Sequence, residues 1–256
     1  MNHNAHHQLM KNPHLEGGPF LWKAGPTGIL LVHGYTATTA EVRPLAQALH
    51  ARGYTVSGPV LPGHNANPED INKYRWRDWV AVVEDAYQDL FAHCDQIFLG
   101  GESTGGLLAL YLAPQHPEIS GLLTYAPALK LRFKPFDQLK LRLAAPFIPY
   151  LPKTGGEDDL PWKGYTVNPL KGVIQLLNLQ KQVLHNLNQI RRPILIVQGK
   201  LDTTVDPNVP QTIYNEVRSN IKEIYRMEKS SHCVIIDSEF DQVVEITQQF
   251  ISKVLI

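Results

Sequence analysis

Short apolar runs alternate with amphipathic segments along most of this chain, and this alternation constrains the fold more than any other feature. The runs Gly28–His33 and Pro193–Gly199 are almost continuously apolar, which is typical of strands that are covered on both faces. The segment Trp76–Phe91 instead places its apolar residues at helical spacing. Strands that alternate with helices favour right-handed crossovers and a mostly parallel sheet flanked by helices. We therefore expect an α/β fold.

The same patterns predict the remaining elements of the sheet and its helices. Further strands are expected over residues 54–56, 97–99, 119–125 and 221–227, and further helices over residues 40–52, 104–113, 207–217 and 237–254. A chain of 256 residues can bury one substantial core, and α/β domains of this size are often undivided.

One region interrupts the alternation. Residues 129–187 contain no convincing buried strand, but they include a proline-rich patch over residues 146–161 and a helical pattern over 169–187. A structureless loop of that length is improbable in a compact domain. We expect a core over residues 19–128 and 188–256, an inserted helical cap over 129–187, and a flexible tail over 1–18. Either the cap lines an apolar pocket or it simply packs on the core, and the candidate lining residues are Leu139, Leu143, Phe147, Ile148, Trp162 and Leu176.

Composition excludes several classes of partner. Lysine plus arginine equals aspartate plus glutamate at 24 each, so no net charge favours nucleic acid. No stretch approaches 18 uninterrupted apolar residues, and the N-terminus lacks the apolar core of a signal peptide, so we expect no stable membrane insertion. The cysteines Cys94 and Cys233 offer no disulfide framework and are compatible with a cytoplasmic location. No compact metal-ligand spacing occurs, and we expect neither a metal nor a cofactor.

The pentapeptide Gly101-Glu102-Ser103-Thr104-Gly105 lies between a predicted strand and a predicted helix. A serine hydroxyl is a poor nucleophile, so it has to be held in an exposed tight turn beside a base. The backbone angles of such a turn crowd a Cβ atom, which would explain the small residues two positions on either side of Ser103. The pattern predicts Ser103 as a nucleophile.

Acyl transfer by a serine needs a base, and three histidines follow Ser103 in the chain. His116 lies in a predicted surface turn, and His185 lies in the predicted cap. His232 lies in a polar loop between the last strand and the last helix, at the sheet edge where the tight turn at Ser103, a nucleophile elbow, also lies. This position favours His232 as the base.

A carboxylate should orient that base, and two aspartates are candidates. Asp202 directly follows the strand at 193–199, whereas Asp206 precedes Pro207 and resembles a helix N-cap. Active-site groups of open α/β sheets lie at strand ends, which favours Asp202 over Asp206. The resulting order of serine, aspartate and histidine is the one expected for this type of elbow.

The reaction also needs hydrogen-bond donors for the developing oxyanion. The backbone N–H of Thr104 follows the nucleophile at a helix N-terminus, where the dipole favours negative charge. The loop His33-Gly34-Tyr35 follows the first strong strand, and the N–H of Tyr35 is the best second candidate. His33 is interpreted as a structural residue of that loop, and Cys233 as a packing residue.

With these residues in view, the chain resembles the α/β-hydrolase family, and in particular its small bacterial carboxylesterases and monoacylglycerol lipase-like enzymes. The resemblance covers the chain from about Pro19 onward and is carried by the segments 32–36, 41–45, 53–54, 62–64, 101–106, 198–202 and 231–232, together with Trp79. It implies an α/β-hydrolase fold with Ser103, Asp202 and His232 as a triad. It also implies Tyr35 and Thr104 as backbone oxyanion donors.

The chain departs from the family pattern at four positions. The family commonly has phenylalanine where Tyr35 stands, leucine where Glu102 stands, and methionine or leucine where Thr104 stands, and glycine is usual where Asn65 follows Pro62-Gly63-His64. Glu102 is expected to point back toward the neighbouring strands rather than toward the substrate.

We expect a cofactor-free serine hydrolase that cleaves carboxylic esters through an acyl-enzyme, with small-molecule esters of short to medium acyl chains as substrates. The monoacylglycerol lipase, thioesterase and C–C bond hydrolase activities remain alternatives that would use the same residues. A non-catalytic binding protein of hydrolase fold is the alternative from a different class. The sequence leaves the oligomeric state open.

Overall fold

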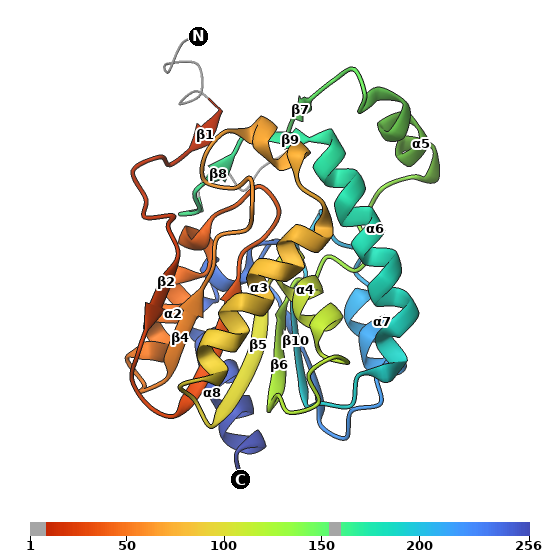
Figure 1. Ribbon diagram of the computed structural model, residues 1–256. Coiled ribbons are helices and arrows are strands. Elements are labelled where there is room, and N and C mark those ends of the chain that lie inside the picture. Colours follow the sequence, from red (N-terminus) through yellow and green to blue (C-terminus); the bar gives the residue numbers. More distant parts are fainter. Residues whose placement is uncertain (1–8, 154–159) are drawn as a thin grey trace.

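A seven-stranded sheet runs through the computed structural model, which describes residues 9–153 and 160–256 (Figure 1). The strand order is β11-β10-β6-β5-β3-β4-β2, and every neighbouring pair is parallel except β2 with β4. The predicted α/β fold with a mostly parallel sheet is therefore confirmed. The strands of this sheet are β2 (Phe20–Trp22), β3 (Thr27–Val32), β4 (Thr55–Gly58), β5 (Gln96–Glu102), β6 (Gly121–Tyr125), β10 (Ile194–Gly199) and β11 (Lys222–Met227).

Helices cover both faces of the sheet. The two hydrophobic cores that result are filled by alternate residues of the same strands, because successive side chains of a strand point to opposite faces. In β3, Leu30 and Val32 belong to one core, and Ile29 and Leu31 belong to the other. The first core packs under α3 (Trp76–Phe91), α4 (Thr104–Leu112), α6 (Leu170–Asn186) and α7 (Val209–Glu216), and the second packs under α2 (Arg43–His50) and α8 (Phe240–Val254).

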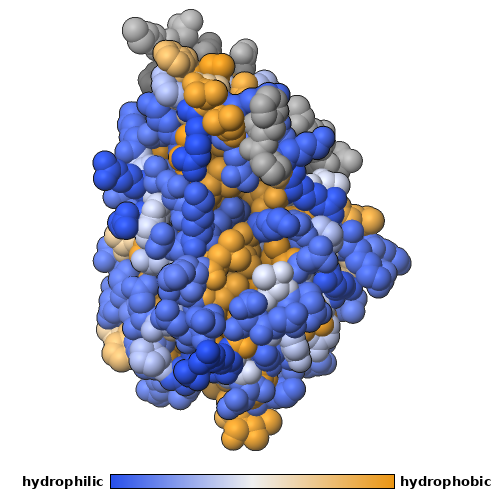
Figure 2. All heavy atoms as spheres, turned by 90° about the vertical axis from the view of Figure 1, so that its right-hand side faces the viewer, coloured by the Kyte–Doolittle hydropathy of each residue, from blue (hydrophilic) through white to orange (hydrophobic). Residues whose placement is uncertain are grey.

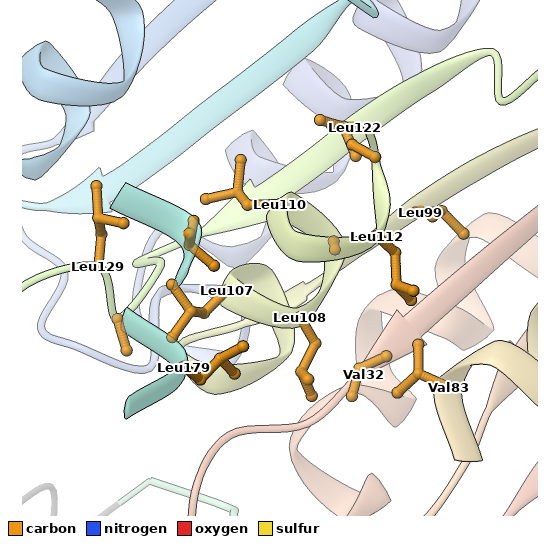
Figure 3. Close-up of a cluster of buried hydrophobic side chains, with 14 of the residues drawn as sticks. Val32, Val83, Leu99, Leu107, Leu108, Leu110, Leu112, Leu122, Leu129 and Leu179 are labelled. Carbon is orange, nitrogen blue, oxygen red and sulfur yellow. The ribbon is translucent and has the colours of Figure 1, made fainter. Parts of the chain in front are cut away.

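Helix α4 has no polar face and is buried over almost its whole surface. Leu107, Leu108, Leu110 and Leu112 point to different sides of the helix, and each is buried among side chains of the first core (Figure 3). A helix that is apolar all round needs neighbours on every side. The sheet supplies one side, and α3 and α6 supply the others. Within the described residues, no helix is long and apolar enough to cross a membrane.

Within 129–187, α5 (Pro135–Ala144), β7 (Tyr150–Pro152) and β9 (Val167–Pro169) lie beyond the carboxyl ends of the central strands, at the top of Figure 1, whereas α6 runs down from there beside α4. Helices α5 and α6 supply the helical part, and α6 matches the helix predicted over 169–187. The strands β7, β8 (Gly164–Tyr165) and β9 were not predicted, because two or three residues are too few to show an alternation. β7 pairs with β9, and β8 pairs with β1 (Met10–Lys11).

Two segments of the predicted domains fall outside the described residues, namely residues 1–8 of the predicted tail and residues 154–159 of the predicted cap.

Figure 2 views the face that carries α5, α6 and α7, and it shows hydrophobic side chains between hydrophilic ones. Short 3₁₀ helices complete the structure at Thr39–Glu41, Pro68–Lys73, Leu187–Gln189 and Val234–Ile236.

Candidate active site

The predicted site residues lie in turns that follow four strands of the sheet. Tyr35 follows β3, Ser103 follows β5, Asp202 follows β10, and His232 lies in the segment between β11 and α8. Because parallel strands end at the same edge, these turns meet there. The structure brings the four residues together at that edge.

Ser103 lies in a strained turn between β5 and α4. Its φ of 52° and ψ of −107° fall in a region that residues with a Cβ atom rarely occupy. The nearby glycines have a second role besides the predicted one, because the backbone carbonyl of Val32 in β3 would collide with a Cβ atom at Gly101 or Gly105. The close approach of β3 requires these glycines, in addition to the geometry of the turn.

A chain of hydrogen bonds joins Ser103, His232 and Asp202. The Nε2 atom of His232 lies 3.0 Å from Ser103 Oγ, and its Nδ1 atom lies 3.0 Å from Asp202 Oδ2. An ionised carboxylate can only accept, so Nδ1 carries the proton and Nε2 is left as an acceptor for the serine hydroxyl. This tautomer is the one that a general base needs.

The carboxylate of Asp202 is almost completely buried, and burial opposes its ionisation. The charge and hydrogen bond of His232 and the N–H groups of Val205 and Thr204 outweigh burial and lower the pKa of Asp202. These two N–H groups donate to Oδ1 at 3.0 and 2.8 Å, while Gln198 Nε2 donates to Oδ2 at 3.2 Å. The carboxylate is therefore held in one orientation as well as held ionised.

The other aspartate and the other histidines considered in the sequence lie outside this chain of hydrogen bonds. Asp206 forms an ion pair with Lys130 at 2.7 Å and accepts from the Asn208 N–H. It does not cap α7 directly, because that helix begins at Val209. His116 lies between Glu84 and Glu118, and His185 lies in the last turn of α6.

The loop after β3 is held by a buried histidine whose tautomer can be assigned. The Leu61 N–H donates to His33 Nε2 at 3.1 Å, so Nδ1 carries the proton and donates to the Gly34 carbonyl at 2.9 Å. Burial lowers the pKa of His33 to about 4, against the opposing effect of its bond to Gly34. A neutral His33 thus fixes the carbonyl of the Gly34–Tyr35 peptide.

Glu41 is a residue of this site that the sequence pattern did not single out. Its Oε2 accepts from the Gly34 N–H at 2.6 Å, and its Oε1 lies 3.6 Å from the buried thiol of Cys233. In the sequence, Glu41 reads as a polar residue at the start of an amphipathic helix. The segment 41–45, which begins with Glu41, is one of those that carry the family resemblance. Nothing in the local sequence, however, shows that the chain folds back so that Glu41 reaches the loop after β3.

The two unusual residues beside the nucleophile are both fully buried. Glu102 ends β5 opposite Tyr125 of β6, and it adds to the effect of burial in raising the pKa of Tyr125. Thr104 is the first residue of α4, so its N–H is one of those that a helix leaves without an intrahelical acceptor. Neither side chain is among the described residues that line the cavity above Ser103.

A cavity of about 910 Å³ opens above Ser103, between the sheet edge and residues of 129–187. Two of the predicted lining residues, Trp162 and Leu176, do line it. The prediction was wrong for the other four, which are exposed to solvent: Leu139, Leu143, Phe147 and Ile148. Helix α5 presents its other face to the cavity, through Asp137, Lys140, Leu141 and Ala144 at helical spacing.

The cavity wall is mixed in character. Near its floor lie Ser103, Glu41 and His232, and its apolar wall includes Leu170 and Val173 of α6. Several charged side chains also line it: Lys11, Arg132, Asp137, Lys140 and Lys153. Among the described residues, no three histidine, cysteine or acidic side chains gather in a way that could hold a metal ion.

Comparison with known proteins agrees with this geometry. Residues 27–239 match the family model described as serine aminopeptidase, S33 (Hydrolase_4). The chain is 35% identical to a thermostable monoacylglycerol lipase from Bacillus sp. (strain H-257) over 94% of this chain and 97% of that protein. It is 30% identical to a carboxylesterase from Bacillus subtilis (strain 168) over 92% of this chain and 96% of that protein.

A solved structure is also similar over almost the whole chain. It comes from work on LipS and LipT, two metagenome-derived lipolytic enzymes, and it superposes with a TM-score of 0.88. The two sequences are 30% identical, and the match covers 93% of this chain and 99% of the solved one. The unmatched part of this chain is much shorter than the segment 129–187, so the likeness extends into that segment as well as over the sheet and its helices.

Proposed function

This chain belongs to the serine aminopeptidase S33 family of α/β-hydrolases, and on that premise we propose that it is a serine hydrolase of carboxylic esters that works through an acyl-enzyme. The observation that carries the proposal is the continuous hydrogen bonding from Asp202 through His232 to Ser103, at 3.0 Å for each step. Two of its relatives are a monoacylglycerol lipase and a carboxylesterase, which supports the choice of an ester over other acyl compounds as the substrate.

In the first half of the reaction, Ser103 Oγ attacks the ester carbonyl while His232 Nε2 takes the hydroxyl proton. The resulting imidazolium is stabilised by the ionised Asp202. Collapse of the tetrahedral intermediate breaks the bond to the alcohol, which leaves with the proton from His232. In the second half, a water molecule gives its proton to His232 and attacks the acyl-enzyme, and the acid is released as Ser103 regains its proton.

The negative charge of each tetrahedral intermediate needs donors, and we assign the N–H groups of Tyr35 and Thr104 to this role. Thr104 begins α4, so the positive end of the helix dipole faces the charge. Tyr35 belongs to the peptide whose carbonyl is held by His33. Removal of one such donor typically costs about 3 kcal/mol of transition-state stabilisation.

For the acyl group we propose short to medium chains. The cavity of about 910 Å³ lies near the upper end of the range for small-molecule sites, and Leu170, Val173 and Leu176 make part of it apolar. Medium-chain monoacylglycerols are the second candidate substrates, because the same cavity has charged side chains near the apolar wall that a glycerol headgroup could contact. Residues 129–187 act in this proposal as a cap that shapes the cavity.

The test has two parts. A fluorophosphonate probe should label the native protein and fail to label Ser103→Ala, and the hydrolysis of p-nitrophenyl butyrate should fall to background in the same variant. A chain-length series of p-nitrophenyl esters, run beside monoacylglycerols and acyl-CoA thioesters, then ranks the substrates. Labelling without turnover of any ester would favour another acyl substrate, and absence of labelling would favour a binding protein.

A further inference from the structure

The side chain of Tyr35 reaches from the oxyanion loop into the first turn of helix α6. Its hydroxyl donates to the carbonyl of Pro169 at 2.5 Å. Burial raises the pKa of Tyr35 well above its ordinary value, against the opposing effect of the Val173 N–H. The hydroxyl thus stays protonated and keeps its bond to Pro169.

Helix α6 needs these contacts because it has no cap of its own. The N-cap residue is Pro169, which has no side-chain oxygen, and the structure shows no side-chain capping bond from it. The first N–H groups of a helix have to find acceptors elsewhere. Lys171 and Gly172 donate to Asn72 Oδ1 at 3.0 and 3.3 Å, and the carbonyl of Pro169 accepts from the Tyr35 hydroxyl.

A glycine inside α6 makes room for the hydroxyl. A Cβ atom at Gly172 would collide with the Tyr35 oxygen and with Ile71. Glycine in a helix is unfavourable by about 1 kcal/mol relative to alanine. A less favourable residue at this position is consistent with a tight fit between α6 and Tyr35.

The same turn of α6 also faces the cavity. Leu170 and Val173 line it, and they directly follow Pro169, which holds the Tyr35 hydroxyl, and Gly172, which makes room for it. At its other end, Tyr35 carries the backbone N–H that faces the proposed oxyanion. The peptide that contains this N–H is fixed by His33 at its carbonyl and by Glu41 at the preceding N–H.

We propose that Tyr35 is a positioning residue, whose hydroxyl couples the cavity-lining turn of α6 to the orientation of its own backbone N–H as an oxyanion donor. The inference rests on the proposed function. It assigns a role to the hydroxyl group, which phenylalanine at this position would lack. The position of α6 then contributes to transition-state stabilisation as well as to substrate binding.

The test compares Tyr35→Phe with a matched control, Tyr165→Phe. Tyr165 also uses its hydroxyl to join residues 129–187 to the core, because it donates to the Gly63 carbonyl and accepts from the Ala66 N–H, each at 2.9 Å. Its backbone N–H donates to the Thr36 carbonyl at 2.8 Å, a bond that phenylalanine keeps, and Tyr165 is not among the described residues that line the cavity. Both variants lose one hydroxyl, with one hydrogen bond in Tyr35→Phe and two in Tyr165→Phe, so Tyr165→Phe should lose at least as much stability.

Tyr35→Phe should lower kcat for p-nitrophenyl esters about tenfold, as expected for the loss of one positioning hydrogen bond, with KM for the acetyl ester changed less than threefold. The affinity of a trifluoromethyl ketone, which forms an oxyanion on Ser103, should fall by the same factor as kcat/KM. Tyr165→Phe should keep kcat within twofold. Equal kcat in Tyr35→Phe and native protein, or an equal loss in Tyr165→Phe, would overturn the inference.

Gly172→Ala provides a second approach if Tyr35→Phe does not fold. The new methyl group should displace the hydroxyl and lower kcat severalfold at unchanged fold, as judged by circular dichroism. In the Tyr35→Phe background, the same substitution should cost less, because the hydroxyl is absent. Additive losses in the two backgrounds would contradict the proposed coupling.

If the native protein hydrolysed no ester, the proposed function would be refuted. The comparison of Tyr35→Phe with Tyr165→Phe would then be judged by the binding of the ketone alone.

Discussion

The substitution Asp202→Asn tests the hydrogen bonding of the site at its most buried point. The amide oxygen should take the place of Oδ1, because the N–H groups of Thr204 and Val205 both donate there. The amide NH₂ would then take the place of Oδ2 and face His232 Nδ1. Two donors cannot share a hydrogen bond, so His232 has to carry its proton on Nε2 instead.

This change removes two contributions to the rate. At an effective dielectric constant of about 20, opposite unit charges about 4 Å apart interact by about 4 kcal/mol, so the imidazolium loses stabilisation worth about 10³-fold in rate. The wrong tautomer adds to this, because Nε2–H cannot accept the Ser103 proton. We expect kcat to fall by about 10³ to 10⁴, as is typical for this substitution in serine hydrolases.

The assay is the hydrolysis of p-nitrophenyl butyrate by purified variants whose folding is checked by thermal denaturation. Asp206→Asn is the matched control, because Asp206 lies four residues away and its side chain forms the ion pair with Lys130 and accepts from the Asn208 N–H, outside the triad. It should retain activity within threefold of the native protein. If Asp202→Asn kept more than a tenth of the native kcat, or if both variants lost equally, the assigned acid would be wrong.

Three further outcomes follow from the geometry of the site. In urea unfolding, Ser103→Gly should be more stable than Ser103→Ala by about 1 kcal/mol, because glycine adopts a φ of 52° without strain. Equal unfolding midpoints for the two variants would argue against a strained turn. The pKa of His33 is about 4 in the folded protein and about 6.5 in the unfolded chain, so the unfolded chain takes up the proton first as the pH falls. The free energy of unfolding should therefore be highest above about pH 6.5 and should fall by about 2 kcal/mol by pH 5. His33→Asn should lose this dependence when unfolding is measured at both pH values. Glu41→Ala should lower the free energy of unfolding by about 1–3 kcal/mol, because it leaves the Gly34 N–H without its acceptor, whereas Glu41→Gln keeps an acceptor and should cost less.

Much of the sheet could be predicted from the sequence because its strands are covered on both faces. Continuous apolar runs such as β10 are long enough to be unambiguous, and α3 begins and ends at the predicted residues. Strand β2 was missed because it has three residues, lies at the edge of the sheet and is only partly buried. The short pairs β1–β8 and β7–β9 depend on contacts between distant segments, which leave no local pattern.

The residues brought together at the site were predictable for a related reason. Ser103, Asp202 and His232 each follow a recognisable element, and the fold places all such turns at one edge. The contacts of Tyr35 and Glu41 were not predictable in this way. The Tyr35 hydroxyl bonds to a residue 134 positions away, and the choice of that partner depends on how the cap packs.

The strained turn at Ser103 is maintained by residues outside the pentapeptide that identifies it. The Ser103 N–H donates to the Tyr125 carbonyl at 2.8 Å, and the Ser103 carbonyl accepts from Leu107 at 3.1 Å and from Ala128 at 3.0 Å. Relaxing φ to an ordinary value would break bonds on both sides of the residue, at a cost comparable to the strain of about 1–3 kcal/mol. Movement of the turn as a unit is opposed by α4, which is buried on all sides. A G-x-S-x-G sequence therefore makes a nucleophile only where a neighbouring strand and a buried helix can hold it, and in this chain β6 and α4 supply both.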